Sequence, residues 1–171
     1  MKPIQIFITG GTLDKAYHEQ TGILYFPDSH LPQMLKEARL QRPFEITVLM
    51  QKDSLDMTQA DRETLLTACQ NSPAEQILIT HGTDTMVNTA QFLQQAINFS
   101  EPSNHKTIIL TGAMRPYSFS QSDALFNLGT AFGFFAKNPS PAGVFIAMNG
   151  QIFSANKVQK NQQAGIFEAI D

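Results

Sequence analysis

The chain has 171 residues, of which 42% are hydrophobic and 16% charged, as in one ordinary globular domain. Its formal net charge of −3 supplies no positive field that would gather nucleic acid or an anionic membrane. The single cysteine, Cys69, excludes an internal disulfide, and no Cys or His cluster has metal-ligand spacing. With no apolar signal region and no stretch long enough to span a membrane, we expect one cytoplasmic domain over residues 1–171.

Short apolar segments alternate with helical patterns along the chain. The predicted strands are Ile4–Thr9, Phe44–Met50, Gln76–Thr80, Thr107–Thr111 and Gly143–Asn149. The predicted helices are Leu31–Arg39, Gln59–Gln70, Asp84–Ile97 and Asp123–Ala136, the second with Thr58 as a capping candidate ahead of Asp61.

The predicted strands are near-continuous apolar runs, which indicates burial on both faces. Their alternation with helices implies right-handed βαβ units. We therefore predict an α/β fold: a three-layer sandwich around a mostly parallel, doubly wound sheet of the Rossmann or flavodoxin kind. One further edge hairpin or strand is expected within residues 150–171.

Small and hydroxyl-bearing residues follow three of the predicted strands. These segments are Thr9-Gly10-Gly11-Thr12, Thr80-His81-Gly82-Thr83-Asp84-Thr85 and Thr111-Gly112-Ala113-Met114-Arg115-Pro116. Ligands of open α/β sheets bind beyond the carboxyl ends of the strands, so the three turns are expected to line one pocket. Glycine permits close backbone approach, which makes the main chain at Gly11, Gly82 and Ala113 a candidate binding site for a substrate oxygen.

The turns also hold candidates for nucleophilic catalysis. A hydroxyl is a weak nucleophile until a base activates it, and a Thr-Asp pair with a nearby lysine supplies a proton path. Thr83 and Asp84 form such a pair, and Lys160 follows the fifth strand. A plain strand-to-loop turn and a nucleotide or phosphate site are the alternatives, but neither G-x-G-x-x-G nor a P-loop lysine pattern is present. His81 is expected to be structural.

Thr9–Thr12 and His81–Thr85 together resemble the paired signatures of the bacterial-type L-asparaginase/glutaminase family, and Gly112–Pro116 is similar to a third family motif. The resemblance implies hydrolysis of a side-chain amide, such as that of asparagine or glutamine, through a threonine acyl-enzyme and without metal or cofactor. It implies the following residue roles: Thr12 as nucleophile, Thr83, Asp84 and Lys160 as its proton-transfer partners, Tyr17 in a flap-like segment as its assistant, and Ser54 as holder of the substrate carboxylate.

Two departures from the family pattern qualify this interpretation. Many members follow the Ser54 position with glutamine, whereas this chain has Leu55, which cannot hydrogen-bond a polar substrate. The family also normally carries a second, smaller C-terminal domain that completes the neighbouring subunit's site, and residues 1–171 resemble the first domain. We therefore expect a homodimer or higher homo-oligomer that partly closes the crevice near Thr12 and Tyr17. We also expect slow turnover of free asparagine or a poor apparent affinity for it.

Other functions remain as alternatives. One is a weakly active or non-catalytic relative that binds an amino acid or a protein partner. Another is an amidotransferase subunit in tRNA-dependent amide chemistry, for which the acidic charge balance gives no sign of tRNA contact.

Overall fold

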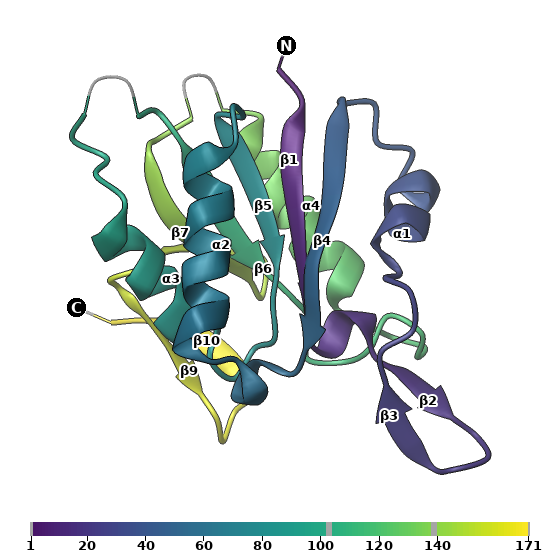
Figure 1. Cartoon of the computed structure of the whole chain (residues 1–171). Helices are drawn as coiled ribbons and strands as arrows, with labels where there is room; N and C mark the ends of the chain where they lie inside the picture. Colours follow the sequence, from purple (N-terminus) through teal and green to yellow (C-terminus); the bar gives the residue numbers. More distant parts are fainter. Residues whose placement is uncertain (1, 102–103, 138–139, 171) are drawn as a thin grey trace.

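The computed structural model, which describes residues 2–101, 104–137 and 140–170, has a six-stranded sheet in the order β4-β1-β5-β6-β7-β8 (Figure 1). Its strands are β1 (Ile4–Gly10), β4 (Phe44–Lys52), β5 (Gln76–Thr80), β6 (Thr107–Thr111), β7 (Gly143–Met148) and β8 (Gln151–Ser154). All neighbours pair in parallel except β7 and β8. The remaining strands form two small hairpins: β2 (Ala16–His18) with β3 (Ile23–Tyr25), and β9 (Val158–Asn161) with β10 (Ile166–Ala169).

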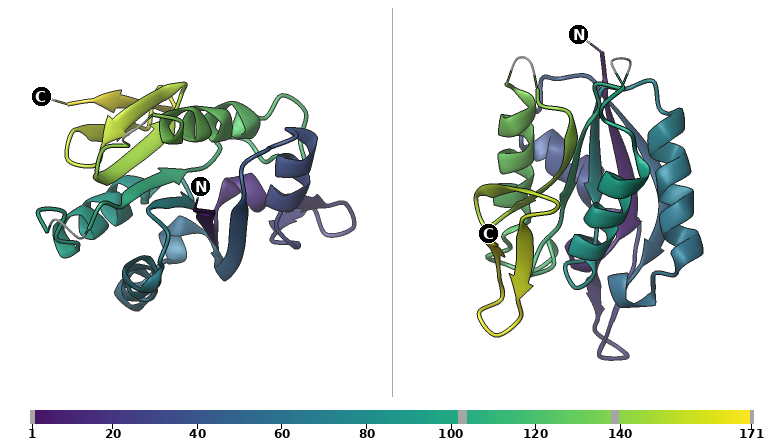
Figure 2. Two further views of the ribbon diagram at one scale, coloured as in Figure 1. Left: turned by 90° about the horizontal axis from the view of Figure 1, so that it is seen from above. Right: turned by 90° about the vertical axis from the view of Figure 1, so that its left-hand side faces the viewer.

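Helices cover both faces of the sheet and make the three layers seen from the side in Figure 2. The helices are α1 (Leu31–Glu37), α2 (Gln59–Asn71), α3 (Met86–Ala96) and α4 (Ala124–Phe135), with short 3-10 turns η1 (Thr12–Asp14) and η2 (Ser54–Asp56). Because successive strand residues face opposite sides, Ile6 packs in the core cluster with α1 and α4, and Phe7 in the cluster with α2 and α3. The predicted α/β sandwich with a mostly parallel sheet is confirmed.

The prediction that Phe44–Met50 is buried on both faces is wrong. This segment forms β4, which lies at the edge of the sheet beside β1. The side chains of Phe44 and Val48 are 37% and 55% exposed. Apolar content indicates a strand but does not fix its place in the strand order, and an edge strand is covered less completely than a central one.

Other boundaries differ by small amounts. The helix expected from Asp84 begins at Met86, because Thr83 and Asp84 belong to the turn that precedes it. Thr58 makes the predicted cap: its hydroxyl accepts the Asp61 N–H, and the Asp61 carboxylate accepts the Thr58 N–H. Residues 150–170 form more than the one expected element, since β8 joins the sheet and β9–β10 make a separate hairpin. Across the three described ranges, no helix is long and apolar enough to cross a membrane.

Candidate active site

Three sequence segments meet at the carboxyl edge of the sheet, the lower edge in Figure 1 between the hairpins β2–β3 and β9–β10. Gly11 has φ +86°, and a Cβ there would lie 2.3 Å from the backbone nitrogen of Gly82. A Cβ on Gly82 would lie 2.7 Å from Ser54 Oγ. Because L side chains do not fit at these contacts, the two glycines allow the turns after β1, β4 and β5 to touch.

Lys160 lies within hydrogen-bonding distance of the predicted Thr-Asp pair. Its Nζ donates to Thr83 Oγ1 at 2.9 Å and to Asp84 Oδ1 at 2.6 Å. Val158, two positions earlier in β9, is buried in the core cluster with Met86. Since alternate strand residues share a face, the anchoring of Val158 directs Lys160 inward, and its side chain is only 10% exposed against 43% for Asp84.

Thr12 and Tyr17 both belong to the segment that follows β1. Thr12 is half-buried and begins η1 directly after Gly11. Tyr17 is 51% exposed on β2, where it pairs with Leu24. Its hydroxyl lies near the hairpin's own turn, 3.7 Å from the position a Cβ on Gly22 would take. The structure therefore leaves Tyr17 on the flap, and none of the hydrogen bonds among described residues joins it to Thr12.

Ser54 is 1% exposed and faces the turn after β5. Its Oγ accepts the Thr85 N–H at 3.3 Å, and its carbonyl accepts the Thr85 hydroxyl at 2.8 Å. Because Oγ acts as an acceptor there, its own proton stays available for donation to a ligand. Leu55, the departure from the family pattern, is 71% exposed and adds no polar group.

A charged pair that sequence reasoning missed lies beside Ser54. Lys15 Nζ donates to Asp53 Oδ2 at 2.5 Å, and the Leu55 N–H donates to Asp53 Oδ1 at 3.1 Å. Burial alone would raise the pKa of Asp53, but the hydrogen bonds from Lys15 and Leu55 outweigh it and hold the pKa below its usual value. Asp53 thus stays ionised and ties the start of η2 to the residue that follows η1.

The third turn is held by α4. The N–H groups of Met114 and Arg115 donate to the Asp123 carboxylate at 3.0 and 3.1 Å, and Asn127 Nδ2 donates to the Gly112 carbonyl at 3.1 Å. Ala113 is 0% exposed, with its side chain in the core. Ala113 therefore presents no exposed atom, of side chain or backbone, to a substrate in this structure.

His81 and Cys69 are both buried. His81 Nδ1 lies 2.7 Å from the Gly82 carbonyl oxygen, and burial lowers its pKa to about 4. The ring is therefore neutral at physiological pH and braces the turn, as its expected structural role requires. Burial also raises the pKa of Cys69 to about 12.

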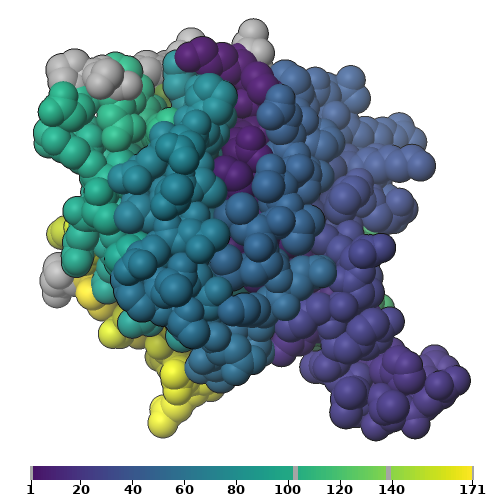
Figure 3. Space-filling view, in the orientation of Figure 1, coloured from purple at the N-terminus to yellow at the C-terminus, as the bar shows by residue number. Residues whose placement is uncertain are grey.

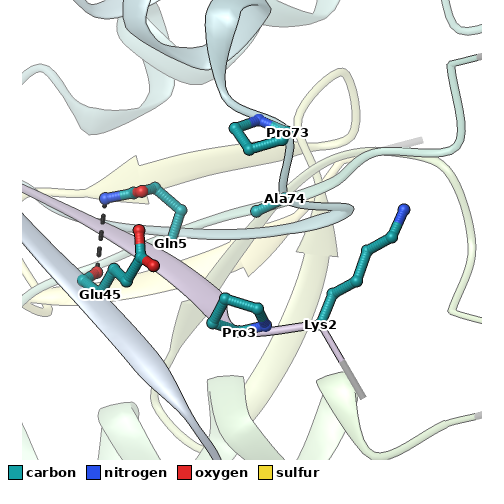
Figure 4. A pocket seen from close by; sticks show the side chains of 6 residues that line it. All are labelled: Lys2, Pro3, Gln5, Glu45, Pro73 and Ala74. Carbon is teal, nitrogen blue, oxygen red and sulfur yellow. Dashed lines mark hydrogen bonds between the residues drawn. The ribbon is translucent and has the colours of Figure 1, made fainter.

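A separate cavity of about 290 Å³ opens at the opposite edge of the sheet, shown in Figure 4. Its lining residues are Lys2, Pro3, Gln5, Glu45, Pro73 and Ala74. They lie at the amino ends of β1, β4 and β5, so the cavity holds none of the threonines considered above. Within the described part of the chain, no group of three or more His, Cys, Asp or Glu side chains could hold a metal ion.

Comparison with known proteins identifies related sequences along the whole chain. The family described as "Asparaginase, N-terminal" matches residues 3–170. The glutaminase-asparaginase of Acinetobacter glutaminasificans is 39% identical over 85 residues, which are 49% of this chain and 24% of that protein. A glutamyl-tRNA(Gln) amidotransferase subunit of Methanococcus vannielii is 31% identical over 158 residues, 89% of this chain and 35% of that protein.

A solved structure gives the same relationship. The thermostable L-asparaginase from Thermococcus kodakarensis superposes with a TM-score of 0.81 and 28% sequence identity, and the match covers 99% of this chain and 51% of that chain. The present chain therefore spans about half the length of this solved structure and a smaller share of the sequence relatives.

Proposed function

Because the chain belongs to the asparaginase family and matches its N-terminal domain, we propose that it is an amidohydrolase that hydrolyses the side-chain amide of a small substrate such as asparagine or glutamine. The observation that carries this proposal is the contact of Lys160 Nζ with both Thr83 and Asp84. A lysine from a distant hairpin, a buried threonine and an acid form a proton-transfer group beside the turn that bears Thr12.

In the proposed mechanism, Thr12 Oγ attacks the amide carbon and forms an ester, and the amide nitrogen leaves as ammonia. The hydroxyl proton of Thr12 passes to that nitrogen with the help of Thr83, Lys160 and Asp84. Water then attacks the ester, which releases the acid and restores the Thr12 hydroxyl. Tyr17 would assist Thr12 once the flap moves it from its half-exposed position, a motion of the kind that completes many active sites.

Substrate binding is assigned to the groups around this centre. We assign the Ser54 hydroxyl as donor to the substrate carboxylate, and the backbone at Gly11, Gly82 and Ala113 to the oxyanion. Asp84 is 43% exposed on its side chain, so it is accessible to a substrate ammonium group. Leu55 is exposed and apolar, so recognition of a free amino acid depends on fewer polar contacts than a glutamine at this position would allow.

We further propose that residues 1–171 form one domain, that the protein is cytoplasmic, and that it assembles as a homodimer or higher homo-oligomer. The exposed apolar residues of the flap, Tyr17, Ile23, Leu24 and Tyr25, support association. Binding of metal, cofactor, nucleic acid or membrane is no part of this proposal. Because an open crevice excludes water poorly, turnover of free asparagine is expected to be slow, or its apparent affinity poor, even when the partner partly closes the site.

An ammonia-release assay over a panel of amides tests the proposal. The parent protein should release ammonia from at least one of asparagine, glutamine and small peptide amides, and Thr12→Ala should abolish the release while Thr12→Ser retains part of it. Absence of hydrolysis across the panel would favour a weakly active or purely binding relative. Parent-like hydrolysis by Thr12→Ala would refute the assigned nucleophile.

A second candidate follows from the match to the amidotransferase subunit of Methanococcus vannielii, which covers 89% of this chain. In that case the same site would release ammonia for transfer to an acceptor on another protein. The net charge of −3 gives no support for direct tRNA contact. If hydrolysis of glutamine alone is strongly stimulated by a copurified partner, this second function is favoured over free amide hydrolysis.

A further inference from the structure

Asp14 is a completely buried acid two residues beyond Thr12. Its side chain is 0% exposed, and it ends the short turn η1 that Thr12 begins. Its backbone N–H donates to the Gly11 carbonyl at 3.1 Å. Asp14 is therefore built into the same turn as the proposed nucleophile.

The Asp14 carboxylate reaches the far end of the flap. Oδ1 accepts the Ser29 hydroxyl at 2.8 Å and the His30 N–H at 3.0 Å. These bonds close the segment 15–28, which contains the hairpin β2–β3 and Tyr17. Asp14 thus connects the last residues of the flap directly to the turn that carries Thr12.

The hairpin has little support beyond its base. It projects from the body as the knob at the lower right of Figure 3, and Tyr17 and Ile23 are 51% and 59% exposed. Other contacts at the base are the ion pair of Lys15 with Asp53, a bond from Ser118 Oγ to the Lys15 carbonyl at 2.9 Å and one from Gln51 Nε2 to the Pro27 carbonyl at 2.6 Å. The position of Tyr17 is therefore set by the bonds at the base.

A buried carboxylate is a costly way to make this connection. Among the described residues Asp14 Oδ2 is buried without a hydrogen-bond partner, and burial raises the pKa of Asp14 despite the bonds from Ser29 and His30. Burying an ionised group with an unsatisfied oxygen opposes folding. Residues that lower stability are found mainly at functional sites, so the burial of Asp14 beside Thr12 indicates a functional role.

We propose that Asp14 is a positioning residue for the proposed amide hydrolysis: its carboxylate oxygen anchors the base of the flap to the nucleophile turn, so that the flap carries Tyr17 toward Thr12 from a fixed base. This inference rests on the proposed function and extends it to a residue outside the proton-transfer group. Asp14 acts through Tyr17 and Thr12 and does not contact the substrate.

Four variants separate the effect of the hydrogen bonds between Asp14 and residues 29–30 from other effects of substitution. Asp14→Ala removes the acceptor, and Asp14→Asn keeps a carbonyl oxygen and removes the charge. Ser29→Ala removes one donor at the far end of the flap, where the side chain is only half-buried, and so covers the case that Asp14→Ala fails to fold. Asp28→Ala is the matched control, because Asp28 is an exposed acid of the same loop.

Amide hydrogen exchange of residues 15–28 is the measurement that needs no substrate. Asp14→Ala should speed exchange there by about tenfold or more while β5 exchanges as in the parent, since only the local opening changes. Ser29→Ala should shift exchange in the same direction by less. Asp14→Asn and Asp28→Ala should stay within about threefold of the parent.

Steady-state kinetics of the same variants then test whether these hydrogen bonds affect amide hydrolysis. Asp14→Ala should lower kcat by about tenfold or more with KM little changed, and Asp14→Asn should restore most of it. Tyr17→Phe should lower kcat in the parent and add little in Asp14→Ala, because a flap that is no longer held loses the contribution of Tyr17 already.

Unchanged exchange in both Asp14→Ala and Ser29→Ala would overturn the inference, as would additive effects of Asp14→Ala and Tyr17→Phe. Equal losses in Asp14→Asn and Asp14→Ala would also overturn it, because the charge and not the acceptor would then matter. If the parent hydrolyses no amide, the proposed function fails by itself, and the exchange rates still decide whether Asp14 ties the flap.

Discussion

Substitution of Lys160 by methionine separates its expected catalytic role from its role in stability. Lys160 makes two hydrogen bonds, to Thr83 Oγ1 and Asp84 Oδ1. Methionine keeps an unbranched stem of similar length but donates to neither oxygen. The proposed proton-transfer group would then lose its central member, while the β9–β10 hairpin keeps its anchor through Val158 in the core.

The two expected magnitudes differ widely. Loss of a positioned proton-transfer group lowers kcat by about 10²- to 10⁴-fold. The two bonds of Lys160 contribute little to stability: the pair with Asp84, whose side chain is 43% exposed, and the bond to Thr83 are each worth about 1 kcal/mol at most. For a chain of this size, a loss of about 1–2 kcal/mol corresponds to a fall in Tm of about 2–8 °C.

Ammonia release and thermal unfolding of Lys160→Met, measured beside Lys157→Met, test this directly. Lys157 is an exposed lysine that precedes the same strand, so its substitution controls for loss of one positive charge in the hairpin and should leave kcat near the parent value. A kcat of Lys160→Met within about threefold of the parent would refute the proton-transfer role. A fall in Tm much larger than expected would assign Lys160 a structural role instead.

Three further predictions use glycine, histidine and cysteine positions. Gly11→Ala should abolish activity and lower the free energy of unfolding by about 2 kcal/mol or more, because its Cβ would lie 2.3 Å from Gly82 N at φ +86°. The control Gly129→Ala has nothing within 4 Å of its Cβ and should stabilise helix α4 by about 0.5–1 kcal/mol. Burial lowers the pKa of His81 from 6.5 to about 4, so its neutral form supports folding fully above pH 6.5. The free energy of unfolding, measured by urea titration at each pH, should therefore fall by roughly 3 kcal/mol as the pH falls from 6.5 to about 4. His81→Gln should weaken this dependence on pH. An equal dependence in the parent and in His81→Gln would contradict the argument. Cys69 is buried with a pKa of about 12, so a thiol reagent at pH 8 should label it only as fast as the protein unfolds, and rapid labelling of folded protein would contradict its burial.

The sequence predicts well those features that depend on local periodicity and on the edges of a parallel sheet. The apolar run Ile4–Thr9 and its neighbours indicate strands, and the residues after them necessarily share one edge. The contact of Lys160 with Thr83 and Asp84 could be expected from the family resemblance, since Lys160 lies in the separate hairpin β9–β10 and not directly after a parallel strand. The glycines that follow the first and third predicted strands also indicate a close backbone approach, and Gly11 does pack closely on Gly82.

Features that depend on tertiary arrangement could not be predicted. The exposure of β4 follows from the strand order, which apolar content does not encode. The role of Asp123 depends on α4 lying against the third turn, where its carboxylate accepts the N–H groups of Met114 and Arg115. Asp14 looks like an ordinary turn residue in sequence, and its burial becomes visible only when residues 29–30 return to η1.

Trapping of the covalent intermediate tests the central claim most directly. The parent protein, mixed with the amide it hydrolyses best and quenched in acid during turnover, should yield a peptide enlarged by the mass of the substrate minus ammonia. Peptide sequencing by mass spectrometry should locate this ester on Thr12, and Thr12→Ala should carry no adduct. An adduct on Thr83, or ammonia release by Thr12→Ala at the parent rate, would contradict the account.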